Sequence, residues 1–208
     1  MRKKAVVILN ILIVAGTIAG VVMMILGTGK NSMLTTSGVE NLKYFTVLSN
    51  LFCGIVASAF LIAGCKSKKL LPWKLMAATA VALTFLMIAV FFGPLYGWLK
   101  LYQGSNLMFH LIVPVLAIVE FILLDGEFPF RYTFLAGAPA LVYGAFYLAN
   151  ILINGTGTWP HSNDWYGFVN WGLGVGIVIF AVVVLTSWGI ACLLRWINKK
   201  NPRCASKE

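Results

Sequence analysis

Residues 107–124 read LMFHLIVPVLAIVEFILL, and this apolar stretch decides the fold class. A helix of about 20 such residues crosses the hydrocarbon core of a bilayer. Five more stretches have a similar length and character: Ala5–Gly27, Tyr44–Gly64, Leu75–Leu95, Tyr132–Ile153 and Trp171–Leu194. The six spans use most of the chain, so we expect an all-α integral membrane protein whose residues 1–208 form one bundle of six transmembrane helices.

Composition and charge agree with a membrane protein. Hydrophobic residues make up 60% of the chain and charged residues 11%, which excludes an ordinary soluble domain. If the spans alternate sides, thirteen of the sixteen Lys and Arg residues fall on the side that holds both termini, and only Lys30, Lys43 and Lys100 fall on the other. The positive-inside rule then places both termini in the cytoplasm.

This charge distribution also bears on partners and location. The net charge of +10 follows the predicted loops, so we expect contact with anionic lipid headgroups and no nucleic-acid partner. The compact multi-pass chain is typical of a bacterial plasma-membrane protein. With two histidines and no CxxC pair, the sequence predicts neither a metal site nor a cofactor. No feature of the sequence indicates the oligomeric state.

Two polar clusters open two of the spans. The second span begins with YFTVLSN at residues 44–50, and the fourth follows NLMFH at residues 106–110. Polar groups in lipid cost several kcal/mol each unless they find partners, so they are functional candidates. Both spans are predicted to run inward from the outer interface. Thr46 and His110 should therefore lie at similar depth, each within about one helical turn of that interface.

Helical spacing groups these residues further. Residues i, i+3, i+4 and i+7 share a face, which joins Thr46, Ser49, Asn50 and Cys53 in one stripe. A hydroxyl beside a neutral imidazole offers nucleophilic attack on a carbonyl, with His110 as the base. Ser49 and Cys53 are alternative nucleophiles that spacing does not exclude. The structural alternative is that these hydroxyls bond their own helix or join neighbouring helices.

Supporting groups can be named in the same way. Asn50 or Asn106 could donate an amide hydrogen to a developing oxyanion or fix the imidazole tautomer. Asp164, in the outer loop 154–170, could orient His110 from above. That loop combines glycine, proline and aromatic residues, which predicts an ordered cap. Glu120 is expected to pair with Arg131 near the inner end, because it lies only about one turn from that end.

At these residues the chain resembles a known family. YFTVLSN at residues 44–50, followed by His110 and Pro114 on a later span, is similar to the androgen-induced-protein superfamily and its small bacterial six-span relatives. The resemblance implies an intramembrane threonine hydrolase that cleaves fatty acid esters of hydroxy fatty acids. It implies Thr46 as the nucleophile and His110 as its histidine. The outer-loop sequence WPH at residues 159–161 departs from the tyrosine-proline wording of relatives, and a branch that resembles acyltransferases uses cysteine.

The leading hypothesis is thus an intramembrane lipid-ester hydrolase that acts on membrane lipids or fatty acid esters. One alternative is an acyltransferase of the same superfamily, which would form the same acyl-enzyme. A second is a small transporter or a lipid- or proton-binding protein that uses His110 and Glu120. A third is a structural partner in which the polar stripe only packs helices.

Overall fold

The computed structural model describes residues 2–27, 38–158 and 161–201. Six helical segments in these ranges are long and apolar enough to cross a membrane, which confirms the all-α, six-span prediction. They are α1 (Arg2–Ile25), α2 (Phe45–Ile62), the continuous run Lys68–Tyr96, the run Ser105–Leu123, α8 (Arg131–Asn154) and α9 (Leu173–Lys200). The third segment begins at Lys68 and α9 ends at Lys200, both beyond the predicted spans. Lysine side chains can keep their charged ends in water there, so each helix continues past the apolar span.

The third and fourth segments are built from several shorter elements. The third joins η2 (Lys68–Leu70), α3 (Leu71–Leu86), η3 (Met87–Phe92) and α4 (Gly93–Tyr96). The connection and the fourth contain α5 (Trp98–Leu101), α6 (Ser105–Leu107), η4 (Met108–Ile112) and α7 (Val113–Leu123). A short helix, η1 (Gly38–Lys43), precedes α2.

Two of these elements, η3 and η4, are π-helical, and a proline follows each of them. Pro94 and Pro114 have no N–H to donate to the carbonyl four residues earlier, and their rings push against it. The wider π turn accommodates each proline within the helix. π turns of this kind are frequent at functional sites. His110 lies within η4.

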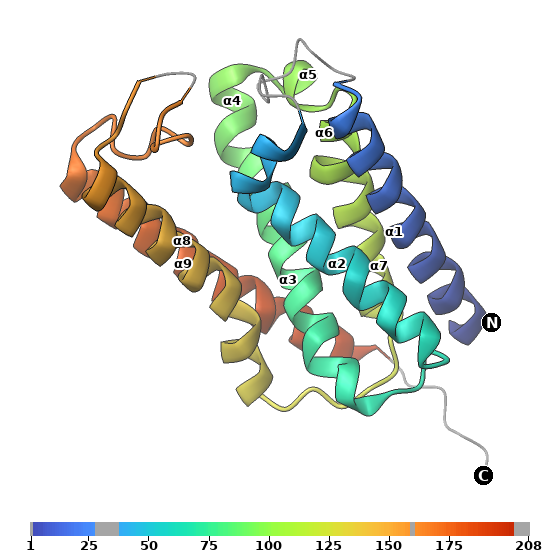
Figure 1. The fold of residues 1–208 in the computed structure, drawn as a ribbon. Coiled ribbons are helices and arrows are strands. Elements are labelled where there is room, and N and C mark those ends of the chain that lie inside the picture. The colour runs from blue at the N-terminus through green and yellow to red at the C-terminus, as the bar shows by residue number, and fades with distance from the viewer. Residues whose placement is uncertain (1, 28–37, 159–160, 202–208) are drawn as a thin grey trace.

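The central helix is α3, which contacts α2, α7, α8 and α9, while α1 packs against α2 and α7. Figure 1 shows α1, α2, α3 and α7 side by side, with the α8–α9 pair leaning away from them toward the end that carries α4 and α5. We call this the outer end. It also holds the loop of residues 155–172, and α1 begins and α9 finishes at the opposite, inner end.

Buried apolar side chains fill the bundle in three clusters from the inner to the outer end. The inner cluster centres on Phe60, Leu75 and Phe121, the middle one on Ile13 and Val81, and the outer one on Val47 and Phe109. Close approach of α1 depends on small residues. A Cβ at Gly20 would clash with the Phe109 ring. Small residues at such contacts are the usual means of packing membrane helices.

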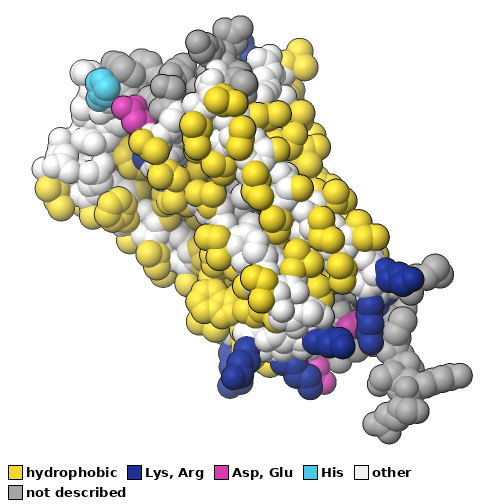
Figure 2. Space-filling view, turned by 45° about the vertical axis from the view of Figure 1, so that its right-hand side comes forward, with side chains coloured by type: hydrophobic (Ala, Val, Ile, Leu, Met, Phe, Trp, Pro, Cys, Tyr) yellow, Lys and Arg dark blue, Asp and Glu magenta, His cyan; other side chains and the backbone are white. Residues whose placement is uncertain are grey.

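Side-chain types are segregated along the molecule. Figure 2 shows a broad hydrophobic band, with the visible Lys and Arg side chains gathered mostly at the inner end. This distribution agrees with the charge asymmetry of the sequence, and the cytoplasmic location of both termini remains a prediction. Lys30, one of the three outer basic residues, lies outside the described residues, as do Trp159 and Pro160 of the outer-loop sequence.

The inner end holds a buried ionic network. Lys74 on α3 lies 2.8 Å from the Glu120 carboxylate on α7, and Asn10 on α1 bonds both of them at 2.9 and 2.8 Å. All three side chains are at most 3% exposed. The expected pair of Glu120 with Arg131 is therefore wrong. The α3–α7 packing brings a basic side chain to Glu120 that the linear order of the chain does not suggest.

Hydrogen bonds to the last carbonyls of α7 close the same end. Arg2 donates to the carbonyls of Leu123 and Ile122, at 2.6 and 3.1 Å. Asn198 donates to two further carbonyls of this segment at 2.8 Å each. The last carbonyls of a helix have no partner within it, so these side chains satisfy them and join α1 and α9 to α7.

Candidate functional site

A cavity of about 680 Å³ lies at the outer end, lined by residues of α2, α3, η3, α4, α5, α6, η4, α8, α9 and the described part of the 155–172 loop. Most of its lining is apolar or aromatic. Five lining residues carry the polar groups that the chemistry of a site requires: Thr46, Thr84, Asn106, His110 and Asp164. Four of these were predicted from the sequence. A mostly apolar cavity with a few converging polar groups is the usual form of a small-molecule site.

His110 is held by the backbone of a neighbouring helix. Its side chain is 4% exposed, and Nδ1 lies 2.6 Å from the carbonyl oxygen of Leu101 at the end of α5. A carbonyl only accepts hydrogen bonds, so Nδ1 carries the hydrogen and the lone pair is on Nε2. This contact sets the tautomer and the ring orientation that a general base needs. The sequence had suggested an asparagine or Asp164 for that role.

Thr46 lies in the first turn of α2 and is half-buried. Its carbonyl accepts hydrogen bonds from Ser49 Oγ at 3.0 Å and from Asn50 Nδ2 at 2.7 Å. Within the described part of the chain, its hydroxyl has no hydrogen-bond partner, and none joins it to His110. The fold thus brings the two predicted residues to one cavity without a direct bond between them.

Ser49, Asn50 and Cys53 have a different position from Thr46, although they share its stripe. Ser49 Oγ lies 3.1 Å from the Thr84 hydroxyl, and Asn50 Nδ2 donates to the Phe109 carbonyl at 2.9 Å. These bonds join α2 to α3 and to η4. None of the three lines the cavity, and Cys53 belongs to the middle apolar cluster. The structural alternative, in which the polar stripe packs helices together, therefore describes Ser49, Asn50 and Cys53.

Asn106 has the least satisfied side chain of the site. It is fully buried and lines the cavity, yet neither its amide nitrogen nor its amide oxygen has a hydrogen-bond partner among the described residues. A buried polar atom without a partner costs about 1–3 kcal/mol. Such a group beside the cavity would gain hydrogen bonds from a ligand that reached it.

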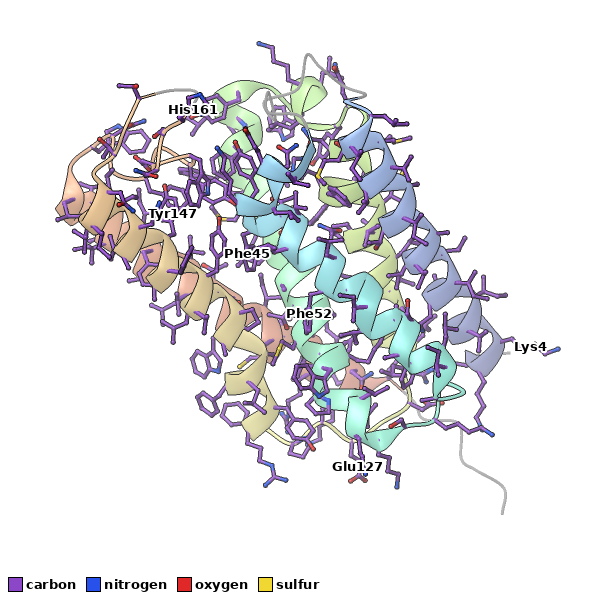
Figure 3. All side chains as sticks on the ribbon, in the orientation of Figure 1. Lys4, Phe45, Phe52, Glu127, Tyr147 and His161 are labelled. Carbon is purple, nitrogen blue, oxygen red and sulfur yellow. The ribbon has the colours of Figure 1, made fainter. Side chains whose placement is uncertain are left out.

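Asp164 organises the outer loop and does not contact His110, which corrects the expectation from the sequence. Its carboxylate accepts hydrogen bonds from the Tyr147 hydroxyl and from the backbone amides of Phe168 and Val169, the last two at 2.9 and 3.1 Å. The described part of the loop is thereby tied to α8, as expected for an ordered cap. Figure 3 shows Tyr147 on α8 and Phe45 on α2 on facing sides of this outer region.

The loop also docks on the start of α2. The Phe45 amide donates to the Tyr166 hydroxyl at 2.8 Å, one residue before Thr46. The Tyr143 hydroxyl donates to the Lys43 carbonyl and accepts from Trp165 Nε1. These contacts cover the cavity beside the predicted nucleophile.

Tyrosines form much of the cavity wall, and the sequence analysis missed their role. The ring centroids of Tyr147 and Trp165 are 4.9 Å apart, and those of Tyr166 and Phe168 are 5.3 Å apart. Burial raises the pKa of the Tyr166 phenol well above its usual value, and nearby Tyr143 adds to the effect. The phenol stays protonated at neutral pH. The sequence signal for this wall was the i, i+4 spacing of Tyr143 and Tyr147.

Metal binding and homology give no further assignment. Among the described residues, no three His, Cys, Asp or Glu side chains lie together as a metal site would require. The chain matches no protein-family model, no curated protein and no solved structure.

Proposed function

We propose that this protein is an intramembrane lipid-ester hydrolase in which Thr46 is the nucleophile and His110 the general base. One observation carries the proposal: Thr46, His110 and the unpartnered Asn106 amide line one apolar cavity. The Leu101 carbonyl occupies Nδ1 of His110 and leaves Nε2 as the basic nitrogen. The apolar lining suits an acyl chain, and the polar groups suit an ester carbonyl.

The reaction begins when Thr46 Oγ1 attacks the ester carbonyl carbon while His110 Nε2 takes its proton. A threonine hydroxyl is a weak nucleophile at neutral pH and needs such a base. The carbonyl oxygen becomes an oxyanion that accepts a hydrogen bond from the Asn106 amide nitrogen. An amide donor of this kind is worth about 10²–10³ in rate where it has been removed from other enzymes.

The tetrahedral intermediate then collapses. The bond to the alcohol oxygen breaks, His110 returns its proton to that oxygen, and the alcohol leaves an acyl group on Thr46. Water attacks this acyl-enzyme with His110 again as the base. Thr46 recovers its proton, and the products are one carboxylic acid and one alcohol for each ester and water consumed.

The first substitution test compares Thr46 with another threonine. Thr79 is buried with an unpartnered hydroxyl and does not line the cavity, so Thr79→Ala is the matched control. We expect purified protein in detergent to release fatty acid from long-chain esters, Thr46→Ala to lose at least a thousandfold of this rate, and Thr79→Ala to keep it. Full activity in folded Thr46→Ala would contradict the proposed nucleophile.

The second substitution test compares the two histidines. His110→Gln should lose activity because an amide cannot accept the threonine proton, whereas His161→Ala in the exposed outer loop should not. Size-exclusion profiles and circular dichroism check that each variant is folded. If wild-type protein releases no fatty acid but transfers the acyl group to an added alcohol, the same dyad serves an acyltransferase. Flux of a solute that survives Thr46→Ala but is lost in His110→Gln would favour a transporter that uses His110.

A further inference from the structure

The charge of the outer cavity differs from that of the whole chain. The sequence has sixteen Lys and Arg against six Asp and Glu. Among the described residues that line the cavity there is no Lys or Arg, and Asp164 is the only Asp or Glu. A ligand with a carboxylate or phosphate would find no cationic side chain in this lining.

Asp164 strengthens this selection because its acidic side chain is held in one position. Its side chain is 8% exposed, and one phenol and two backbone amides hold it in place. A second negative charge in the same cavity would repel it in a medium of low dielectric constant. The ammonium group of Lys43 lies over the rings of Tyr44 and Trp165, at 5.5 and 5.8 Å, but Lys43 does not line the cavity.

The outer loop instead supplies neutral polar groups. Thr156, Ser162 and Asn170 all belong to it and line the cavity. The Tyr166–Phe45 contact brings the loop beside Thr46, so an ester held at Thr46 lies close to this loop, and we assign its alcohol portion to that side. Hydroxyl and amide groups exchange hydrogen bonds with uncharged hydroxyls, since each can donate and accept.

We propose that the cavity takes an uncharged single-chain ester whose alcohol portion carries free hydroxyl groups, a lipid of the monoacylglycerol type, and selects against esters that end in a carboxylate. The inference rests on the proposed function for the ester linkage. The volume of about 680 Å³ lies within the range of about 300–1,000 Å³ for sites that enclose drug-sized ligands, which suits one acyl chain and a small headgroup.

Three substrates test the selection in turnover. They are a long-chain monoacylglycerol, an acyl ester of a hydroxy fatty acid, and the methyl ester of that same compound, which differs from it only in charge and one methyl group. We expect the monoacylglycerol and the methyl ester to be cleaved at least tenfold faster, as kcat/KM, than the free acid. A free acid cleaved as fast as its methyl ester, or faster, overturns the inference and leaves the hydrolase proposal standing.

Binding separates this inference from the catalytic mechanism. Ether analogues cannot be cleaved, so a 1-O-alkylglycerol and an alkyl ether that ends in a carboxylate, of equal chain length, are offered to purified Thr46→Ala protein. The bound lipid is measured by mass spectrometry after washing. At least tenfold more alkylglycerol than acid is expected to be retained, even if no ester is hydrolysed. Equal retention, preference for the acid, or no retention of either overturns the inference.

A charge placed in the loop sharpens the result. Thr156→Lys adds a cation to a residue that lines the cavity. The substitution keeps the Thr156 carbonyl, which accepts hydrogen bonds from the Asn163 amide and the Ser162 hydroxyl. Thr158→Lys adds a cation at an exposed position outside the lining and is the control. Thr156→Lys should reduce the preference for the neutral ether at least threefold relative to Thr158→Lys. The same preference in both variants would contradict selection by charge within the cavity.

Discussion

Asn10 and Asn106 are both fully buried asparagines of one bundle, yet their surroundings are opposite. At the inner end, the Asn10 amide donates to the Val6 carbonyl and to Glu120 and accepts from Lys74, so both ends of the amide are bonded. At the outer end, neither amide atom of Asn106 has a hydrogen-bond partner in the part of the chain that the structure describes. The first completes a network of the fold, and the second faces a cavity that a ligand can fill.

The difference shows how to distinguish structural from functional polar groups within a membrane bundle. Sequence treats both as costly residues in lipid. Only the hydrogen-bond partners in the folded protein distinguish the two asparagines. A polar side chain with all its hydrogen bonds made stabilises the fold, whereas one without partners costs free energy until a ligand binds to it. Each of the following substitutions breaks or sharpens this contrast.

The largest effect on stability is expected at the inner network. Lys74→Met leaves the Glu120 carboxylate buried without its cation, which should lower the free energy of unfolding by about 3–5 kcal/mol. The measurement is unfolding in mixed detergent. The double variant Lys74→Met, Glu120→Leu removes both charges and should recover most of the loss. A double variant no more stable than the single one would contradict the view that an unpaired charge causes the loss.

The two asparagines themselves give the next effect. Asn10→Leu removes hydrogen bonds to Glu120 and Lys74 and should cost about 1–3 kcal/mol of folding stability. Asn106→Leu breaks no hydrogen bond within the fold, so its stability should be equal or higher. Its ester hydrolysis should fall about 10²–10³-fold through loss of the oxyanion donor. Equal stability losses in the two variants would remove the contrast between them.

The smallest effect is expected where the outer loop meets α2. Tyr166→Phe removes the acceptor of the Phe45 amide and should cost about 1 kcal/mol, since one neutral hydrogen bond is lost. The readout is faster hydrogen exchange at the Phe45 amide with little change in global stability. Tyr132→Phe, near the inner end, is the matched control. Unchanged exchange at Phe45 would show that the loop does not depend on this contact.

The fold was predictable because apolar runs of the length of a bilayer admit few alternatives. The predictions that failed concern the end of the third span and the pairing of charged side chains. Lys74 was placed just outside the third span because its charge suggested an interface, whereas it turns inward to Glu120. Arg131 was expected as the partner of Glu120 because Glu120 lies about one turn from the predicted inner end, and that depth carries no information on how α3 packs against α7.

The site was predictable only where helical periodicity applies. Periodicity predicted Thr46 from the face that polar residues share on α2. The polar residues before α7 gave His110 and Asn106. All three line the cavity. The Leu101 carbonyl that holds His110 could not be found in this way, because it belongs to a short separate helix between two glycines with positive φ, Gly97 and Gly104. Contacts set by loop geometry leave no periodic signal.

The central claim is that the outer cavity is a catalytic site with Thr46 as its nucleophile. The most direct measurement is to mix the protein with the p-nitrophenyl ester of a long-chain fatty acid, quench with acid during the first turnover, and map the acyl group by mass spectrometry of peptides. The account predicts an acyl group on Thr46 in wild-type protein, and none on that residue in His110→Gln. An acyl group on Ser49 or Cys53, or none on any residue while ester is being hydrolysed, would contradict it.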